Sequence, residues 1–138
     1  MAKQSLIRSF KRAFIGIGVG LGEKNFIRHI ASTVGAVFLA IYYGLSSLEL
    51  AIIVLCCFAV LSAELLNTSV EKLANGHKNP RQALDVAASG VLFMAFGALA
   101  VGIILFWPHI CTDPLPFVIV AVSIPLIWVL LERDGSSN

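Results

Sequence analysis

Charged residues are scarce in this sequence. They make up 13% of its 138 residues, while 58% are hydrophobic; an ordinary soluble domain has about 25% charged residues. A soluble globule of this size has too little interior to bury so many apolar side chains, so most of them must face lipid. The composition therefore excludes a disordered chain, and the length predicts a single membrane domain over 1–138.

Cysteine is also scarce, with three residues, Cys56, Cys57 and Cys111. Adjacent residues on a helix point about 100° apart, so we expect unpaired thiols at Cys56 and Cys57, and Cys111 alone in a loop. This excludes a disulfide scaffold. The net charge of +2 is too small to indicate a nucleic-acid partner.

Long apolar runs are what the sequence does contain. Four of them approach the roughly 20 residues that a membrane crossing needs, and they cover 26–45, 48–70, 86–107 and 115–131. The fourth run is short and contains Pro125, which membrane helices tolerate better than soluble ones do. We expect an all-α integral membrane bundle, with a fourth crossing at 115–131.

The basic residues fall on one side of this topology. The ten Lys and Arg residues lie before the first run or in its first turn, between the second and third runs, or after the fourth, whereas the opposite connections, 46–49 and 108–114, contain none. The positive-inside rule then places both termini and the 72–84 loop in the cytoplasm. The first run is expected to be retained, because no apolar core with a cleavage site follows the basic start.

The segment 3–20 has the pattern of an amphipathic helix lying on the membrane surface. It is either a simple anchor or one wall of a site at that surface. Four glycines follow at every second position, Gly16, Gly18, Gly20 and Gly22. They match neither nucleotide-binding glycine motif, so we interpret them as a flexible joint.

Polar residues form a stripe at the end of the second run. Glu64, Asn67, Glu71 and Asn75 share one helical face. Counting back from Lys72 puts Glu64 about 12 Å inside the cytoplasmic boundary, where an ionisable group costs about 2.5 to 3.5 kcal/mol. The stripe is therefore a candidate functional site, although a glutamate that only holds helices together is the simpler alternative.

The stripe suits one kind of chemistry. Carboxylates at the membrane surface can hold Mg²⁺ together with nucleotide phosphates, and a deeper carboxylate can accept a proton from an alcohol. Together they predict phosphoryl transfer to a lipid hydroxyl.

Three motifs carry a resemblance to a known family. They are the E-x-x-N-[ST]-x-x-E run over 64–71, the Glu-Lys-Asn-Phe-x-x-His run over 23–29, and the Asp-Val-Ala-Ala-Ser-Gly run over 85–90. Over about 5–107 the chain resembles the prokaryotic diacylglycerol kinase and undecaprenol kinase family. The resemblance implies a surface helix, a three-crossing core over 26–107, a homotrimer, and MgATP-dependent phosphorylation of a lipid alcohol at the cytoplasmic face of a bacterial inner membrane.

The resemblance also implies a role for each motif residue. Glu64 would be the general base on the lipid hydroxyl, with Asn67 beside it as a hydrogen-bonding partner. Glu23 and Glu71 would be the Mg²⁺ ligands, and Asp85 would contact the nucleotide.

The chain departs from the family pattern near the nucleotide. Leu84 stands where a phosphate-binding Lys is usual, so Arg81 or Lys78 is expected to supply that cation. Asn75 stands where Asp is usual, and it remains a candidate nucleotide contact. The 72–84 loop is shorter than usual, and the chain from Leu115 onward has no counterpart in the three-crossing pattern.

Other polar residues receive simpler interpretations. We expect His29 to contact a headgroup or a helix end, His109 to lie in a loop, and Glu49 and Asp113 to be solvated charges outside the membrane.

Three functions remain open: a kinase acting on diacylglycerol, a kinase acting on undecaprenol, and a small proton-coupled transporter or an inactive family member. A transporter site lies near the bilayer midplane, whereas the polar stripe runs to the cytoplasmic edge. The sequence therefore favours the kinase.

Overall fold

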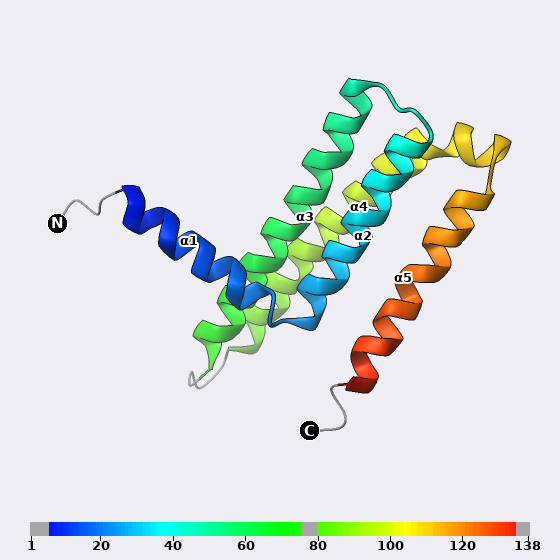
Figure 1. Ribbon diagram of the computed structural model, residues 1–138. Coiled ribbons are helices and arrows are strands. Elements are labelled where there is room, and N and C mark those ends of the chain that lie inside the picture. The colour runs from blue at the N-terminus through cyan, green and yellow to red at the C-terminus, as the bar shows by residue number, and fades with distance from the viewer. Residues whose placement is uncertain (1–5, 76–79, 135–138) are drawn as a thin grey trace.

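The computed structural model describes residues 6–75 and 80–134, and within these ranges the chain is a bundle of helices without strands. The predictions for Lys78 and for residues 3–5 of the surface segment lie outside the described residues. The helices are α1 (Leu6–Gly20), α2 (Lys24–Tyr42), α3 (Ser47–Ala74), α4 (Arg81–Thr112) and α5 (Leu115–Asp134) (Figure 1). The all-α membrane fold is confirmed.

The helices α2, α3 and α4 form the centre of the bundle. The helix α3 packs against both α4 and α2, α5 packs on α2, and α1 leans away from the bundle at its start (Figure 1). Among the described helices, α2, α3 and α4 are long and apolar enough to cross a membrane, while the apolar part of α5, Leu115–Leu130, is shorter. The fourth crossing stays a prediction.

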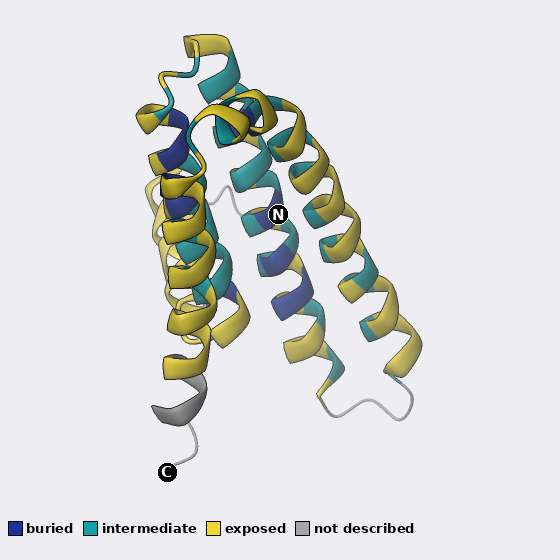
Figure 2. Cartoon of the chain, turned by 90° about the vertical axis from the view of Figure 1, so that its right-hand side faces the viewer, coloured by how far each residue is buried: buried dark blue, intermediate teal, exposed yellow. Residues whose placement is uncertain are grey.

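The buried core is small and most large apolar side chains face outward. Leu39, Ala40, Ile53 and Phe106 form the core cluster. Figure 2 shows buried residues on the inward faces, while α4 is exposed along most of its length. An outward apolar surface of this extent is what a chain solvated by lipid requires.

Two of the expected solvated charges instead hold helix ends. Glu49 closes a capping box at the start of α3: its backbone N–H donates to Ser46 Oγ at 3.4 Å, and the Ser46 N–H donates to Glu49 Oε2 at 2.8 Å. Asp113 accepts a hydrogen bond from the Tyr42 hydroxyl at 3.3 Å on Oδ2 and from the Tyr43 hydroxyl at 2.7 Å on its carbonyl oxygen. Both residues thus have specific hydrogen-bond partners at accessible positions, and their place outside the membrane stays a prediction.

The end of α4 also differs from the expectation. The helix continues past Trp107 to Thr112, so His109 and Cys111 are helical residues rather than loop residues. Pro108 lies inside the helix, where its ring and its missing N–H disturb the hydrogen bonding of the preceding turn. Figure 1 shows that the last turns of α4 change direction toward α5.

The glycines do not form the expected joint. Gly16, Gly18 and Gly20 lie within α1, and the chain turns only at Leu21 and Gly22. Gly20 is buried, and a Cβ atom there would lie 2.5 Å from Leu65 Cδ2 and 3.2 Å from Phe26 Cδ1. This glycine permits the close approach of α1 to α3.

Candidate active site

The turn between α1 and α2 places Glu23 against α3. The Glu23 N–H donates to the Gly20 carbonyl at 2.8 Å, and Glu23 is the N-cap residue of α2. Its Oε1 accepts a hydrogen bond from Lys72 Nζ at 2.8 Å. A residue of the α1–α2 turn is thus joined to the last turns of α3.

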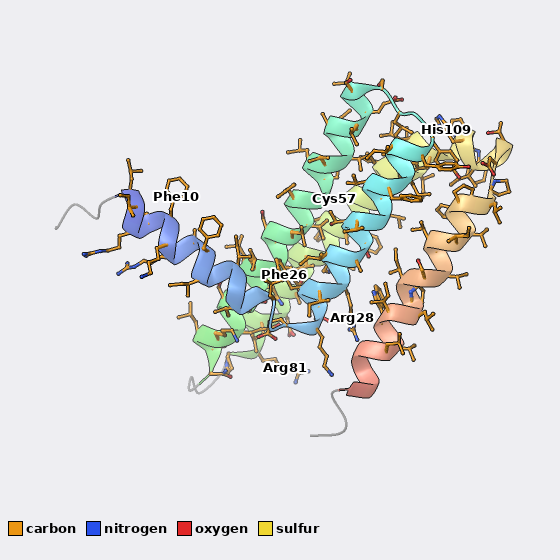
Figure 3. The ribbon with its side chains drawn as sticks, in the orientation of Figure 1. Phe10, Phe26, Arg28, Cys57, Arg81 and His109 are labelled. Carbon is orange, nitrogen blue, oxygen red and sulfur yellow. The ribbon has the colours of Figure 1, made fainter. Side chains whose placement is uncertain are left out.

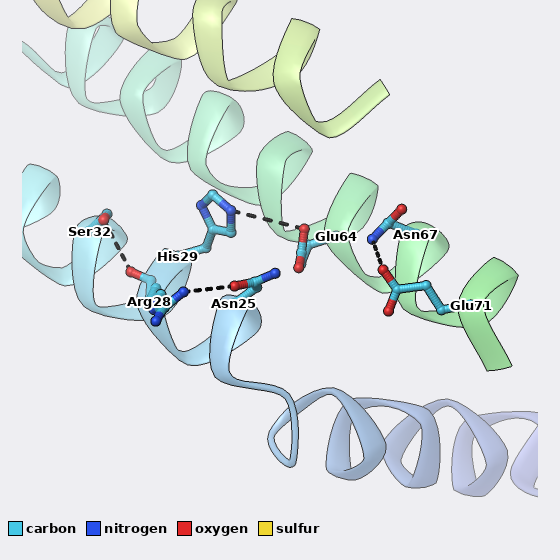
Figure 4. Close-up of polar contacts among 7 residues, drawn as sticks. All are labelled: Asn25, Arg28, His29, Ser32, Glu64, Asn67 and Glu71. Carbon is cyan, nitrogen blue, oxygen red and sulfur yellow. Dashed lines mark hydrogen bonds and ion pairs between the residues drawn. The ribbon is translucent and has the colours of Figure 1, made fainter. Parts of the chain in front are cut away.

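The polar stripe of α3 goes from buried to exposed toward the end of the helix. Glu64 is 4% exposed and Asn67 is 7% exposed, whereas Glu71 and Asn75 are exposed. Asn67 Nδ2 donates to Glu71 Oε1 at 2.7 Å (Figure 4). The amide therefore fixes the orientation of the next carboxylate along the helix.

One pocket brings three carboxylates together. It has a volume of about 340 Å³ and is lined by Gly22, Glu23, Lys24, Asn25, Glu64, Thr68 and Glu71. Glu23 comes from the α1–α2 turn, and Glu64 and Glu71 come from α3 two helical turns apart. We call this the carboxylate pocket.

His29 contacts the buried carboxylate, contrary to the expected headgroup or helix-end contact. Its Nε2 lies 4.0 Å from Glu64 Oε2, and Figure 4 shows the two side chains facing each other from α2 and α3. Sequence reasoning missed this pair, and it missed Asn25 and Thr68 as pocket residues. The 23–29 motif contains both Asn25 and His29, but only the packing of α2 against α3 shows which carboxylate His29 faces.

The expected nucleotide contacts do not line the carboxylate pocket. Arg81 and Asp85 are exposed on the first turns of α4, and Asn75 is the exposed C-cap residue of α3. Figure 3 shows Arg81 and Arg28 at the same end of the bundle, with His109 at the other end. In the single chain these residues are near the site but not part of its wall.

Asn67 also borders a second pocket. That pocket lies between α3 and α4, and its lining includes Asn67, Gln82 and Gly90. The Asn67 Oδ1 atom is buried and has no hydrogen-bond partner among the described residues. Asn67 thus has its donor on Glu71 and an acceptor still available.

The carboxylate pocket fits a hard divalent cation shared with a substrate. In the described part of the chain, no group of three or more His, Cys, Asp or Glu side chains could hold a metal ion alone. Mg²⁺ does not need such a group, because it binds through one or two carboxylates plus phosphates and water. Glu23 and Glu71, on the same pocket wall, match that donor set.

The fold and this site define the class of protein: a helical membrane protein with a buried carboxylate and two more accessible ones at one end of its spanning helices. Residues 11–106 match the family model described as prokaryotic diacylglycerol kinase. The chain belongs to this family of lipid kinases.

Two curated relatives agree with the family. The chain is 30% identical over 111 residues to a diacylglycerol kinase of Synechocystis sp., a match that covers 75% of this chain and 63% of that protein. It is 28% identical over 114 residues to an undecaprenol kinase of Bacillus subtilis, covering 75% of this chain and 93% of that protein. The chain thus spans less than two thirds of the cyanobacterial relative. No solved structure matches the chain.

Proposed function

We propose that this protein transfers the γ-phosphoryl group of ATP to the hydroxyl of a membrane lipid alcohol at the cytoplasmic face of a bacterial inner membrane. The observation that carries the proposal is the carboxylate pocket, which combines a buried Glu64 with the more accessible Glu23 and Glu71. An acceptor arriving from the bilayer and a donor arriving from the cytoplasm can meet there.

Glu64 is the proposed general base. Its carboxylate takes the proton of the lipid hydroxyl while the alcohol oxygen bonds to the γ-phosphorus. The bond between that phosphorus and the β–γ bridging oxygen breaks, and ADP leaves. His29, 4.0 Å from Glu64 Oε2, orients the carboxylate toward the acceptor.

Glu23 and Glu71 are the proposed Mg²⁺ ligands. These two carboxylates would hold Mg²⁺, which when bound would supply positive charge opposite the phosphates. Asn67 keeps Glu71 in place through its 2.7 Å hydrogen bond, and Lys72 holds Glu23 until the nucleotide complex arrives.

The nucleotide contacts are proposed to be Asp85, Arg81, Lys78 and Asn75. Arg81 or Lys78 supplies the phosphate-binding cation, because Leu84 stands where the family usually has Lys. Arg81, Asp85 and Asn75 are exposed outside the pocket wall, so we propose that a homotrimer brings some of them to a neighbouring site. The fourth crossing by α5, with both termini in the cytoplasm, completes the proposed arrangement.

The test is transfer of radiolabelled phosphate from ATP to lipid by the purified full chain. Diacylglycerol and undecaprenol are assayed separately, each with Mg²⁺ and with a chelator. We expect chelator-sensitive product with one or both lipids, and a loss of about 10²- to 10⁴-fold in Glu64→Gln, the usual contribution of a general base.

The matched control is Glu49→Gln, because Glu49 lies at the opposite end of the same helix and glutamine also serves in a capping box. Equal losses in the two variants would contradict the role of Glu64. Absence of lipid product in the parent protein, with proton-coupled uptake in vesicles, would establish the transporter alternative instead.

The acceptor is decided by the same assay. The undecaprenol kinase of Bacillus subtilis is matched over 93% of its length, which supports a polyprenol acceptor as the second candidate beside diacylglycerol.

A further inference from the structure

The helix α5 has no role in the family pattern. The family match ends at residue 106, and α5 begins at Leu115. The helix nevertheless packs closely on α2: a Cβ atom at Gly35 would lie 2.8 Å from Val120 Cγ1 and 3.2 Å from Ile124 Cδ1. At the other end of this contact, the Arg28 guanidinium lies 5.5 Å above the centre of the Trp128 ring.

This packing leaves an apolar pocket between α2, α3, α4 and α5. Its volume is about 590 Å³, and α5 contributes Phe117, Val120, Ala121 and Ile124 to the lining. We call it the apolar pocket. Three polar side chains of α2, His29, Ser32 and Thr33, line it near one end, and its other polar side-chain groups are the thiols of α3 and the indole N–H of Trp107.

The lining of the apolar pocket suits a long-chain alcohol. Its α2 side runs from His29 to Leu39, about 15 Å along the helix axis. Most of the lining is apolar, as a hydrocarbon chain requires, and the polar side chains of α2 gather near one end, where a hydroxyl group would lie.

The apolar pocket lies next to the carboxylate pocket. His29 lines the apolar pocket and lies 4.0 Å from Glu64, which lines the carboxylate pocket. The Ser32 hydroxyl already donates to the Arg28 carbonyl at 3.1 Å, so its proton is engaged within α2. A long-chain alcohol in the apolar pocket would therefore present its hydroxyl to His29 and Glu64.

We propose that α5 completes a binding pocket for the hydrocarbon chain of the lipid acceptor and thereby selects which chains reach Glu64. This inference rests on the proposed function and adds a specificity-determining element outside the family core.

The first test is photolabelling of the full chain in phosphatidylcholine vesicles, without ATP. The probe is a long-chain alcohol with a diazirine in its tail. We expect labelling of Val120, Ala121 and Ile124 that an excess of unlabelled alcohol removes, and labelling of the outward residues Ile119 and Val122 that it does not remove. A phosphatidylcholine carrying the same diazirine tail serves as the probe without a free hydroxyl.

The second test fills the pocket. Ala121→Trp places a large ring in the lining, and Val122→Trp is the control on the next, lipid-facing position of α5. We expect Ala121→Trp to raise the KM for the lipid about tenfold or more with little change in kcat. The substitution removes contacts to the hydrocarbon tail of the lipid and leaves the contacts to its reacting hydroxyl unchanged. Ala98→Phe, which fills the same pocket from α4, should do the same, with Ala100→Phe as its control.

The outcomes separate this inference from the proposed function. If the alcohol protects α5 but no phosphate is transferred, the pocket stands and the kinase proposal fails. If phosphate is transferred while the alcohol protects no α5 residue, or while both tryptophan variants behave alike, α5 is not part of the acceptor site. Equal labelling of Val120, Ala121 and Ile124 by the phosphatidylcholine probe would mean that the pocket holds bulk lipid, which also overturns the inference.

Discussion

At the residue scale, Lys72 competes with the proposed Mg²⁺ for the carboxylate of Glu23. The ion pair is 2.8 Å long, and its side chains are 51% and 38% exposed, so it contributes at most about 1 kcal/mol to stability. Its larger effect is on the cation site, because Lys72 neutralises one of the two proposed Mg²⁺ ligands. We predict that Lys72→Ala lowers the Mg²⁺ concentration needed for half-maximal lipid phosphorylation.

This prediction is checked by Mg²⁺ titration of the kinase assay at saturating ATP. Lys11→Ala is the control, because Lys11 is an exposed cation on α1 at a distance from the pocket lining. A midpoint that rises in Lys72→Ala, or that moves equally in both variants, would show that Lys72 does not compete with the cation.

At the scale of single elements, the position of α1 depends on Gly20. A Cβ atom there would meet Leu65 and Phe26, whereas a Cβ atom at Gly18 would meet nothing within 4 Å. We predict that Gly20→Val separates α1 from α3 and lowers activity, since Glu23 lies three residues farther along the chain. Gly18→Ala should instead stabilise the protein by about 0.5 to 1 kcal/mol through helix propensity.

Thermal unfolding in detergent, together with the kinase assay, checks this pair of variants. We expect raised Mg²⁺ to restore part of the activity of Gly20→Val, because displacing Glu23 weakens cation binding and leaves Glu64 in place. Loss of activity in Gly18→Ala equal to that in Gly20→Val would mean that flexibility in α1, and not its packing, is what the glycines provide.

The elements themselves were largely predictable, and the contacts between them were not. Apolar runs and basic clusters located α2, α3 and α4 because a bilayer imposes length and charge on any crossing. Spacing on one helix also placed Asn67 next to Glu71. The His29–Glu64 pair depends on which face of α2 packs against α3, and the role of Gly35 depends on which face packs against α5. The sequence does not specify these faces, because an apolar stripe can contact lipid as well as another helix.

Element ends were predicted least well, for local reasons. Glu49 caps α3 and Asp113 binds two tyrosines, so charges that composition marks as solvated have specific partners. The third apolar run ends at Trp107, yet α4 continues through Pro108 to Thr112. In each case a side-chain contact or backbone geometry overrides the composition of the segment.

At the scale of the whole molecule, Cys111 reports orientation. It is exposed in the last turn of α4, the helix that begins at Arg81, while Cys56 and Cys57 lie within α3. Figure 3 shows His109, two residues before it, at the opposite end of the bundle from Arg81. We predict that a membrane-impermeant maleimide added to intact spheroplasts labels the protein, and that Cys111→Ser abolishes this labelling. In that serine background, Leu73→Cys, at the far end of α3, should react only after the cells are opened; the reverse pattern would invert the topology.

The site of a single chain is incomplete if Asp85 contributes to catalysis, because Asp85 is exposed and outside the carboxylate pocket. In the proposed homotrimer the missing contact comes from a neighbour. Chains carrying Glu64→Gln and chains carrying Asp85→Asn should each be inactive, yet an equal mixture, dissociated and reassembled together, should regain about a quarter of the parent activity. That fraction follows because a shared site in a cyclic assembly works only when one chain supplies Glu64 and its neighbour supplies Asp85. The control mixture of Glu64→Gln with Glu71→Gln should stay inactive, since both residues line the pocket of one chain.

Two outcomes would contradict this arrangement. No recovery of activity in the first mixture would place Asp85 and Glu64 in the same chain's site. Full activity of Asp85→Asn alone would remove Asp85 from the nucleotide contacts.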